Sequence, residues 1–261
     1  MPINRTCGAV RAAILAILLA HQLPARAAEP AHVLATDWGL TLKSDGSGFY
    51  NDLAKLVLPF DHTEIEYEIK PYMRAKRAFL AAESSCLYPN SLDYLVSTGS
   101  IESADGFIAS KSVIAAQSHV FAPHGSAPPT GPKDLAGKFI TYALGSDVPN
   151  LLKGANARFV AVSDEVGKAR MLLEGRTDLL IAVLPDAKFV FEHLGTDLPP
   201  YDPAYSLDST DIGVICHQTP ENITFIAAVN IHIARLLETG QLREFLISQG
   251  LNPDAHMPHH E

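Results

Sequence analysis

The chain has 261 residues, of which 47% are hydrophobic and 19% are charged, a balance typical of a packed globular protein and not of extended disorder. This length permits one large domain or two smaller ones, each with its own core. The formal net charge of −9 at pH 7 argues against nucleic acid or an anionic membrane as a partner.

Residues 1–28 have the layout of a secretory signal peptide. Arg5 and Arg11 flank the start of an apolar stretch at 12–20, and small residues on either side of Arg26 provide a cleavage site. The alternative is an uncleaved membrane anchor, but the apolar stretch is shorter than the roughly 20 residues that span a bilayer. We therefore expect an exported, periplasmic protein that begins near Glu29 and keeps 17 basic and 29 acidic residues, a net charge of −12.

Two cysteines, Cys86 and Cys216, remain in this mature chain. An oxidising compartment permits a disulfide between them, but two buried free thiols are equally compatible with the composition. The sequence leaves both states open, because it does not give the distance between the two Cα atoms.

Strand and helix patterns alternate in the first third of the mature chain. A β-type run at 32–40 is followed by a Ser/Asp/Gly turn at 44–48 and by apolar residues at helical spacing that end at Pro59. Alternating apolar and charged residues then predict a strand at 64–70, followed by a helix at 73–85 and a short apolar run at 86–89. This order predicts a parallel sheet with helices on its faces.

The same scheme repeats after a Pro/Gly-rich break at 122–132. The patterns predict a strand, a helix, a strand and a helix in turn, and then a buried strand that ends at Pro185. A second break at 195–205 precedes an apolar strand at 211–218 and a closing helical segment at 220–251. We interpret the chain as α/β, with residues 29–121 and 206–261 forming one lobe and residues 122–205 a second lobe inserted in it. Two crossings side by side would make a hinge, with a ligand cleft between the lobes.

Four stretches in this order resemble bacterial extracellular solute-binding proteins of family 3, the polar amino-acid-binding type. They read "GFYNDLAKLV", "DLAGKFI", "SDEVGKARMLLEGRTDLLIAVLPDA" and "NIHIARLLETGQLREFL". The resemblance covers nearly the whole mature chain. It implies a type II periplasmic-binding-protein-like fold, in which two parallel-sheet sandwiches are joined by a two-strand hinge.

The resemblance also implies a function. The protein would be a monomer that captures a small polar solute, amino acid-like or an organic anion, for an ABC permease or a membrane sensor, without a cofactor. Family members usually clamp the ligand carboxylate with an arginine before the first crossing. The corresponding stretch here, residues 99–122, contains no arginine and offers Lys111 only, which places an α-amino acid ligand in doubt.

Candidate ligand contacts follow from the expectation that the cleft meets strand carboxyl ends and helix amino ends. Trp38 either stacks on a ligand or packs against the sheet, and Phe49 is more consistent with the core than with a contact. Arg74 is either an anion contact or a solvated charge beside Lys76 and Arg77. On the first lobe the candidates are Asp37, Trp38, Tyr50, Tyr72, Arg74, Ser110 and Lys111.

Four further candidates belong to the second lobe. Gly145, Ser146 and Asp147 precede a predicted helix, where they bind an anion through exposed N–H groups or simply cap the helix. Asp186 follows the buried strand, at a position where family members often place an acid against a ligand amine, and its alternative role is to cap the next helix.

Other functional classes find less support in the sequence. The terminal histidines His256, His259 and His260 are too close to the chain end to predict a metal site, and no hydrolase, zinc-peptidase or phosphate-loop motif occurs. Two alternatives stay open. One is a periplasmic accessory or signalling module, and the other is a dehydratase-type enzyme that uses Asp37 and Asp186 as base and acid.

Overall fold

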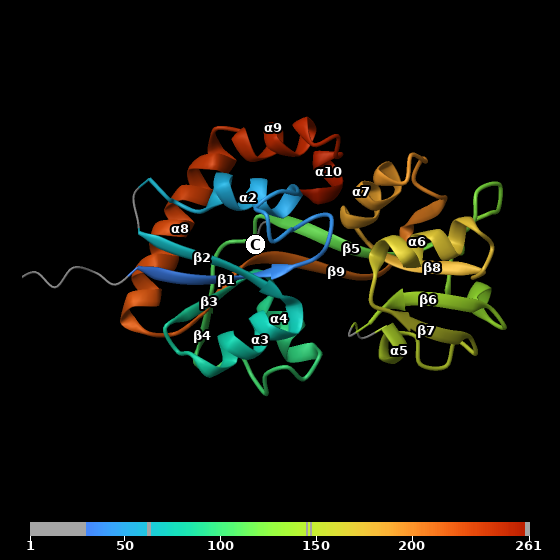
Figure 1. Ribbon diagram of the computed structural model, residues 1–261, viewed down its shortest axis with the longest axis horizontal. Coiled ribbons are helices and arrows are strands. Elements are labelled where there is room, and N and C mark those ends of the chain that lie inside the picture. The colour runs from blue at the N-terminus through green and yellow to red at the C-terminus, as the bar shows by residue number, and fades with distance from the viewer. Residues whose placement is uncertain (1–29, 62–63, 145, 147, 259–261) are drawn as a thin grey trace, which may run out of the picture.

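A computed structural model describes residues 30–61, 64–144, 146 and 148–258. Its elements form two lobes, which Figure 1 shows side by side. The predicted signal peptide lies outside the described residues. None of the helices in the described part of the chain combines the length and apolar character that spanning a bilayer requires.

The first lobe is built on three parallel strands. β1 (Ala31–Asp37) pairs with β2 (Ile65–Pro71) on one side and with β3 (Ser85–Asn90) on the other. The helices of this lobe are α2 (Phe49–Val57), α3 (Tyr72–Ala81), α4 (Leu92–Ser97), α8 (Pro220–Glu238), α9 (Gln241–Ser248) and α10 (Pro253–His256). Helices α2, α8 and α9 lie on one side of the sheet and α3 and α4 on the other (Figure 1).

The second lobe repeats the parallel arrangement. β6 (Phe139–Ala143) lies between β7 (Arg158–Val162) and β8 (Leu179–Leu184), and both pairings are parallel. This lobe also contains the 3-10 turn η1 (Pro132–Leu135) and helices α5 (Val148–Leu151), α6 (Glu165–Leu173) and α7 (Asp186–His193).

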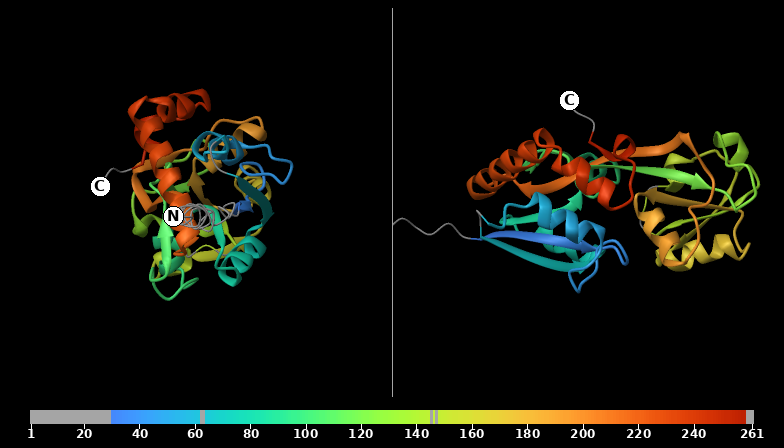
Figure 2. Two further views of the ribbon diagram at one scale, coloured as in Figure 1. Left: turned by 90° about the vertical axis from the view of Figure 1, so that its left-hand side faces the viewer. Right: turned by 90° about the horizontal axis from the view of Figure 1, so that it is seen from above.

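Two long strands run between the lobes. β5 (Ile114–Phe121) and β9 (Tyr201–His217) pair with each other in antiparallel fashion, and Figure 2 shows them side by side where the lobes meet. β9 also pairs with β3 and with the short β4 (Phe107–Ala109), whereas β5 pairs with β8. The strand order is therefore β2-β1-β3-β9-β5-β8-β6-β7, one path through both lobes. The two-strand connection is the expected one, while the lobe boundaries at residues 122 and 205 remain a prediction.

The hydrophobic core is divided along the same lines. The largest cluster fills the first lobe, between its sheet and helices α2, α8 and α9. Two clusters fill the second lobe, one beneath α6 and α7 and one around β6 and α5. Phe189 of α7 nevertheless packs against the first-lobe cluster, and Leu40 packs against the second-lobe cluster, so the packing continues across the junction.

Cys86 and Cys216 form a disulfide. The two residues lie opposite each other on the antiparallel strands β3 and β9, and their Cα atoms are 4.0 Å apart. This resolves the choice between a disulfide and two free thiols in favour of the disulfide.

Several expected elements differ in extent. The strand expected at 211–218 is longer, because β9 already begins at Tyr201 and runs through Pro203, so the second break is shorter than predicted. Pro203 is exposed and lies where the pairing of β9 with β5 shifts register between Tyr201 and Ser206, and such an irregularity tolerates a proline. Each sheet is also mixed and not purely parallel, because β9 and β5 join the parallel strands in antiparallel fashion.

Candidate functional site

The side chain of Asp186 joins the two lobes. It is the first residue of α7, and its carboxylate accepts hydrogen bonds from the hydroxyl of Thr41 at 2.5 Å and from the hydroxyl of Tyr50 at 3.1 Å. Thr41 lies in the loop after β1, and Tyr50 lies in the first turn of α2, so both donors come from the first lobe. All three side chains are buried.

The local sequence explains how Asp186 reaches this position. The buried strand β8 ends at Leu184, and Pro185 takes the N-cap position of α7 without a side-chain cap. Asp186 does not cap the helix, because its two oxygens accept from the opposite lobe. The helix-capping alternative for Asp186 is therefore not what the structure shows.

Thr41 and Tyr50 are held together by the turn that precedes α2. The N–H of Tyr50 donates to the carbonyl of Thr41 at 2.8 Å. Gly48 makes this approach possible, since its φ is 106° and a Cβ at this position would lie 2.7 Å from the carbonyl oxygen of Thr41. Glycine adopts such a conformation without steric cost, and other residues do not.

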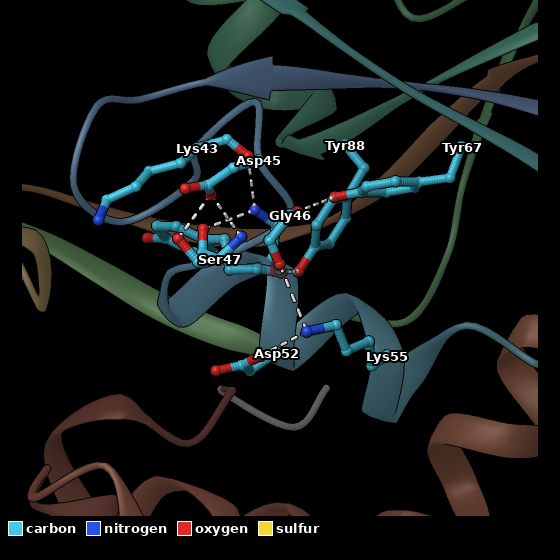
Figure 3. A network of polar contacts seen from close by, with 10 residues as sticks. Lys43, Asp45, Gly46, Ser47, Asp52, Lys55, Tyr67 and Tyr88 are labelled. Atoms are coloured by element: carbon cyan, nitrogen blue, oxygen red, sulfur yellow. Dashed lines mark hydrogen bonds and ion pairs between the residues drawn. The ribbon is translucent and has the colours of Figure 1, made fainter.

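A polar network, part of which is labelled in Figure 3, fixes the same turn. The Asn51 amide donates to the carbonyls of Lys43 and Ser47 at 3.0 and 2.7 Å, and its oxygen accepts from the Tyr67 hydroxyl. The hydroxyl of Tyr88 donates to the backbone carbonyl of Tyr50 at 3.0 Å. The donors that meet Asp186 are thus positioned by the fold of the first lobe alone.

Burial controls the electrostatics of this contact. It raises the pKa of Asp186 to about 6, against the opposing effect of the Thr41 and Tyr50 hydrogen bonds, and the nearby Glu165 carboxylate raises it further. Burial also raises the pKa of Tyr50 well above its usual value, and the adjacent Asp186 adds to the effect. Tyr50 therefore remains a hydrogen-bond donor at physiological pH.

Three aromatic rings extend the contact along the first lobe. The ring of Trp38 lies 6.5 Å from that of Tyr50 and 5.8 Å from that of Tyr72, the latter edge-on. The indole N–H of Trp38 donates to the hydroxyl of Thr36. Trp38 and Tyr72 are half-buried. The arrangement is therefore compatible with both roles expected for Trp38, packing against the sheet and stacking on a ligand.

The ammonium group of Lys76 lies at the far end of this row of aromatic rings. The Nζ of Lys76 lies 5.2 Å from the centre of the Tyr72 ring and donates to the Ser100 hydroxyl at 3.0 Å. Arg74 is exposed, and among the described residues it forms no ion pair. The sequence left Arg74 as either an anion contact or a solvated charge beside Lys76 and Arg77. In the structure it is Lys76 that lies beside the aromatic row.

The remaining candidates are distributed elsewhere. Asp37 ends β1 and accepts the N–H of Gly39 at 2.9 Å. Ser110 and Lys111 fasten the chain to other elements, because the Ser110 hydroxyl accepts the N–H of Val214 on β9 and the Lys111 N–H donates to Asn230 on α8.

In the second lobe, the Ser146 hydroxyl donates back to the carbonyl of Ala143 at 2.9 Å, which is a local turn contact. Gly145 and Asp147 lie outside the described residues. His259 and His260 do as well, and His256 is buried with its ring against the carbonyl of Ala115. Among the described residues, no group of three His, Cys, Asp or Glu side chains is arranged to hold a metal ion.

Sequence reasoning missed three residues of this site. Thr41 stands between two leucines without a local motif, and Glu165 reads as an ordinary first-turn acid of a helix. Lys76 carried one available signal, since it follows Tyr72 by four positions and therefore lies on the same helix face.

Solved structures with a similar two-lobed fold align with most of the chain. No protein-family model matches the chain, and no curated protein matches it. A histidine kinase sensor domain with similarity to periplasmic binding proteins aligns with a TM-score of 0.65 and 15% identity, over 84% of this chain and 95% of that one. The GluR0 ligand-binding core from Nostoc punctiforme, in complex with L-glutamate, aligns with a TM-score of 0.64 and 16% identity, over 83% and 97%. The ancestral amino-acid-binding protein AncCDT-1, described as a precursor of cyclohexadienyl dehydratase, aligns with a TM-score of 0.62 and 13% identity, over 84% and 95%. At these identities the likeness shows the fold, which is the two-lobed periplasmic-binding-protein-like fold.

Proposed function

We propose that the protein is an exported solute-binding protein that takes up a small polar solute between its two lobes. The observation that carries the proposal is the row of side chains from Asp186 through Tyr50, Trp38 and Tyr72 to Lys76, which begins on one lobe and continues on the other. A hinged binding protein needs contacts on both lobes. The solute first binds to one lobe, and its contacts with the other lobe then favour the closed arrangement.

The chemistry of the row suits a solute with polar groups and an apolar body. Once the lobes separate and free Asp186 from Thr41 and Tyr50, its carboxylate can recognise an amine. The aromatic rings provide stacking surface, and the ammonium of Lys76 at the other end recognises an anionic group. Lys76 supplies a positive charge in the absence of the family's arginine, although as a point charge and not as a bidentate fork. This supports an amino acid-like solute or an organic anion.

The solute would be passed to an ABC permease or reported to a membrane sensor. Among the similar structures, one is a histidine kinase sensor domain and another is a substrate-binding domain of a putative amino acid ABC transporter, which supports both possibilities. The expected signal peptide and the acidic mature chain agree with a periplasmic location.

The fluorescence of Trp38 offers a direct test, because it is the only tryptophan of the chain. Refolded, solute-free protein would be titrated with amino acids, organic acids and amines, and each change in emission would be checked by a thermal-shift assay. We expect a saturable emission change and a concentration-dependent rise in melting temperature for one solute class. If no solute of these classes produces either signal, the binding function is wrong and the accessory-module alternative is favoured.

A second candidate function is a dehydratase-type reaction at the same place. One observation favours it: burial raises the pKa of Asp186 to about 6, near the range where a carboxyl group transfers protons at neutral pH. Incubating the protein with each solute that binds and analysing the products by mass spectrometry separates the two functions. Unchanged solute after prolonged incubation excludes the enzyme and leaves the binder.

A further inference from the structure

We infer that the first turns of α7 form an interlobe latch, composed of Asp186, Lys188 and Phe189, which holds the two lobes together when no solute is bound. The inference rests on contacts within the chain and on the two-lobed fold, and not on the identity of a solute.

The residues of the interlobe latch contact three segments of the first lobe. Asp186 accepts from Thr41 and Tyr50 as described above. The Lys188 Nζ donates to the carbonyl of Gln249, just after α9, at 3.2 Å, while it also pairs with Glu192 of its own helix at 2.6 Å. These contacts reach the loop after β1, the start of α2 and the end of α9.

Phe189 adds an apolar contact. Its ring stacks on that of Phe49 with 5.1 Å between the centres and 28° between the planes, and Phe49 in turn lies 5.6 Å from the ring of Phe245 on α9. A second-lobe side chain thus packs into the core of the first lobe. Phe49 was expected to be a core residue, and its position beneath Phe189 explains why an apolar residue is needed there.

The interlobe latch depends on the hydrogen-bond donors that the buried carboxylate of Asp186 finds on the first lobe. In the closed arrangement Asp186 is 8% exposed, and both of its donors belong to the opposite lobe. A buried carboxylate without donors is strongly unfavourable, whereas the same group in water is not. At pH 8, well above the pKa of about 6, the carboxyl group stays charged, so removing the donors makes separation of the lobes the way to rehydrate it. If the charge is then removed as well, the main reason to separate disappears, because an unpaired amide costs less to bury than an unpaired charge.

This reasoning leads to an experiment on protein that has been unfolded, washed and refolded to remove any solute. The wild type would be compared with the double variant Thr41→Val/Tyr50→Phe, and with the same double variant carrying Asp186→Asn. Glu192→Gln is the matched control, because it removes the ion pair within α7 without changing a contact to the first lobe. The radius of gyration would be measured by small-angle X-ray scattering, and the exposure of α7 and of the segment around Thr41 by hydrogen exchange.

We expect the wild type and Glu192→Gln to be equally compact. The double variant should have a larger radius of gyration and exchange that is roughly tenfold to a hundredfold faster around Thr41, the factor that corresponds to hydrogen bonds to a charged group. Adding Asp186→Asn should restore both values, which a general loss of stability would not do.

Three results would overturn the interlobe latch: a double variant as compact as the wild type, a refolded wild type that is already as expanded as the double variant, or an expansion that Asp186→Asn leaves unchanged. If the double variant fails to fold, the single variants Thr41→Val and Tyr50→Phe decide, because each leaves one donor and should expand less. All of these measurements are made without solute. A failed solute screen therefore leaves the interlobe latch intact, and an open wild type leaves solute binding intact.

Discussion

Tyr50 and Asp186 are 136 positions apart in the chain, yet the hydroxyl of the first donates to the carboxylate of the second at 3.1 Å. The pair connects the start of α2 with the start of α7, and therefore one lobe with the other. Its two members are ionisable groups placed in a buried environment, which makes their contact sensitive to pH and to the loss of either partner.

The first prediction concerns the pH dependence of stability. The folded-state pKa of Asp186 is raised from 3.8 to about 6, so the folded protein holds this proton more tightly than the unfolded chain does. The contribution of Asp186 to the free energy of unfolding is therefore most favourable below about pH 4 and falls as the pH rises through 6. A shift of two units corresponds to about 3 kcal/mol.

Urea unfolding of the wild type and of Asp186→Asn between pH 4 and 8 checks this prediction. Other carboxyl groups, such as those of Asp45 and Asp134, have lowered pKa values and act in the opposite direction, so the quantity to follow is the difference between the two proteins. We expect the stability of the wild type relative to the variant to fall by about 3 kcal/mol across this range. Parallel curves for the two proteins would show that Asp186 is not buried as described.

The second prediction concerns Gly48. Alanine at this position would have to adopt φ near 106° and would place its Cβ 2.7 Å from the Thr41 carbonyl oxygen, so both the backbone and the turn must shift. We expect Gly48→Ala to lower the free energy of unfolding by about 3 kcal/mol or more. Gly46→Ala is the control, because φ is 80° there but no atom lies within 4 Å of the added Cβ, and the loss should be limited to about 1 kcal/mol. Equal losses in urea unfolding would contradict the steric explanation.

The third prediction concerns the disulfide between Cys86 and Cys216. The bond closes a loop of 130 residues, and the restriction it places on the unfolded chain is worth roughly 2–5 kcal/mol. The variant Cys86→Ala/Cys216→Ala should therefore unfold at a lower urea concentration, and reductant should lower the stability of the wild type but not of the variant. A wild type whose unfolding is insensitive to reductant under unfolding conditions would show that the thiols are not paired.

The fold was largely predictable because it depends on local patterns. The alternation of Ile65, Tyr67 and Ile69 and the apolar run before Pro185 both became strands of the sheets, and the helix after Gly48 ends at Val57, close to the predicted stop at Pro59. Element boundaries were less predictable. Tyr201 begins β9 inside a Pro-rich break, since pairing with Phe121 of β5 outweighs the local turn signal.

The site was less predictable, because its contacts join distant parts of the chain. Asp186 was correctly placed at the end of β8, but nothing near it in sequence indicates that Thr41 and Tyr50 would meet it. Lys76 was named only as a charge neighbouring Arg74, and its place beside Tyr72 was missed for a related reason. Both lie on α3, and only the position of Tyr72 and Ser100 in space shows which of the two charges turns toward the first-lobe contact.

The last prediction uses this pair of charges. If Lys76 supplies the positive charge for an anionic group of the solute, Lys76→Met should weaken binding, because methionine keeps most of the apolar stem and removes the ammonium. The expected loss is about tenfold to a hundredfold in Kd, the range for a hydrogen bond to a charged group. Arg74→Met is the matched control two positions away on the same helix, and its exposed side chain should leave Kd nearly unchanged. Titration of the Trp38 emission with the solute found in the screen measures both constants. A larger effect of Arg74→Met would assign the anion contact to Arg74, one of the two alternatives that the sequence left open for it, whereas equal and negligible effects would indicate a solute that binds without an anionic contact on α3.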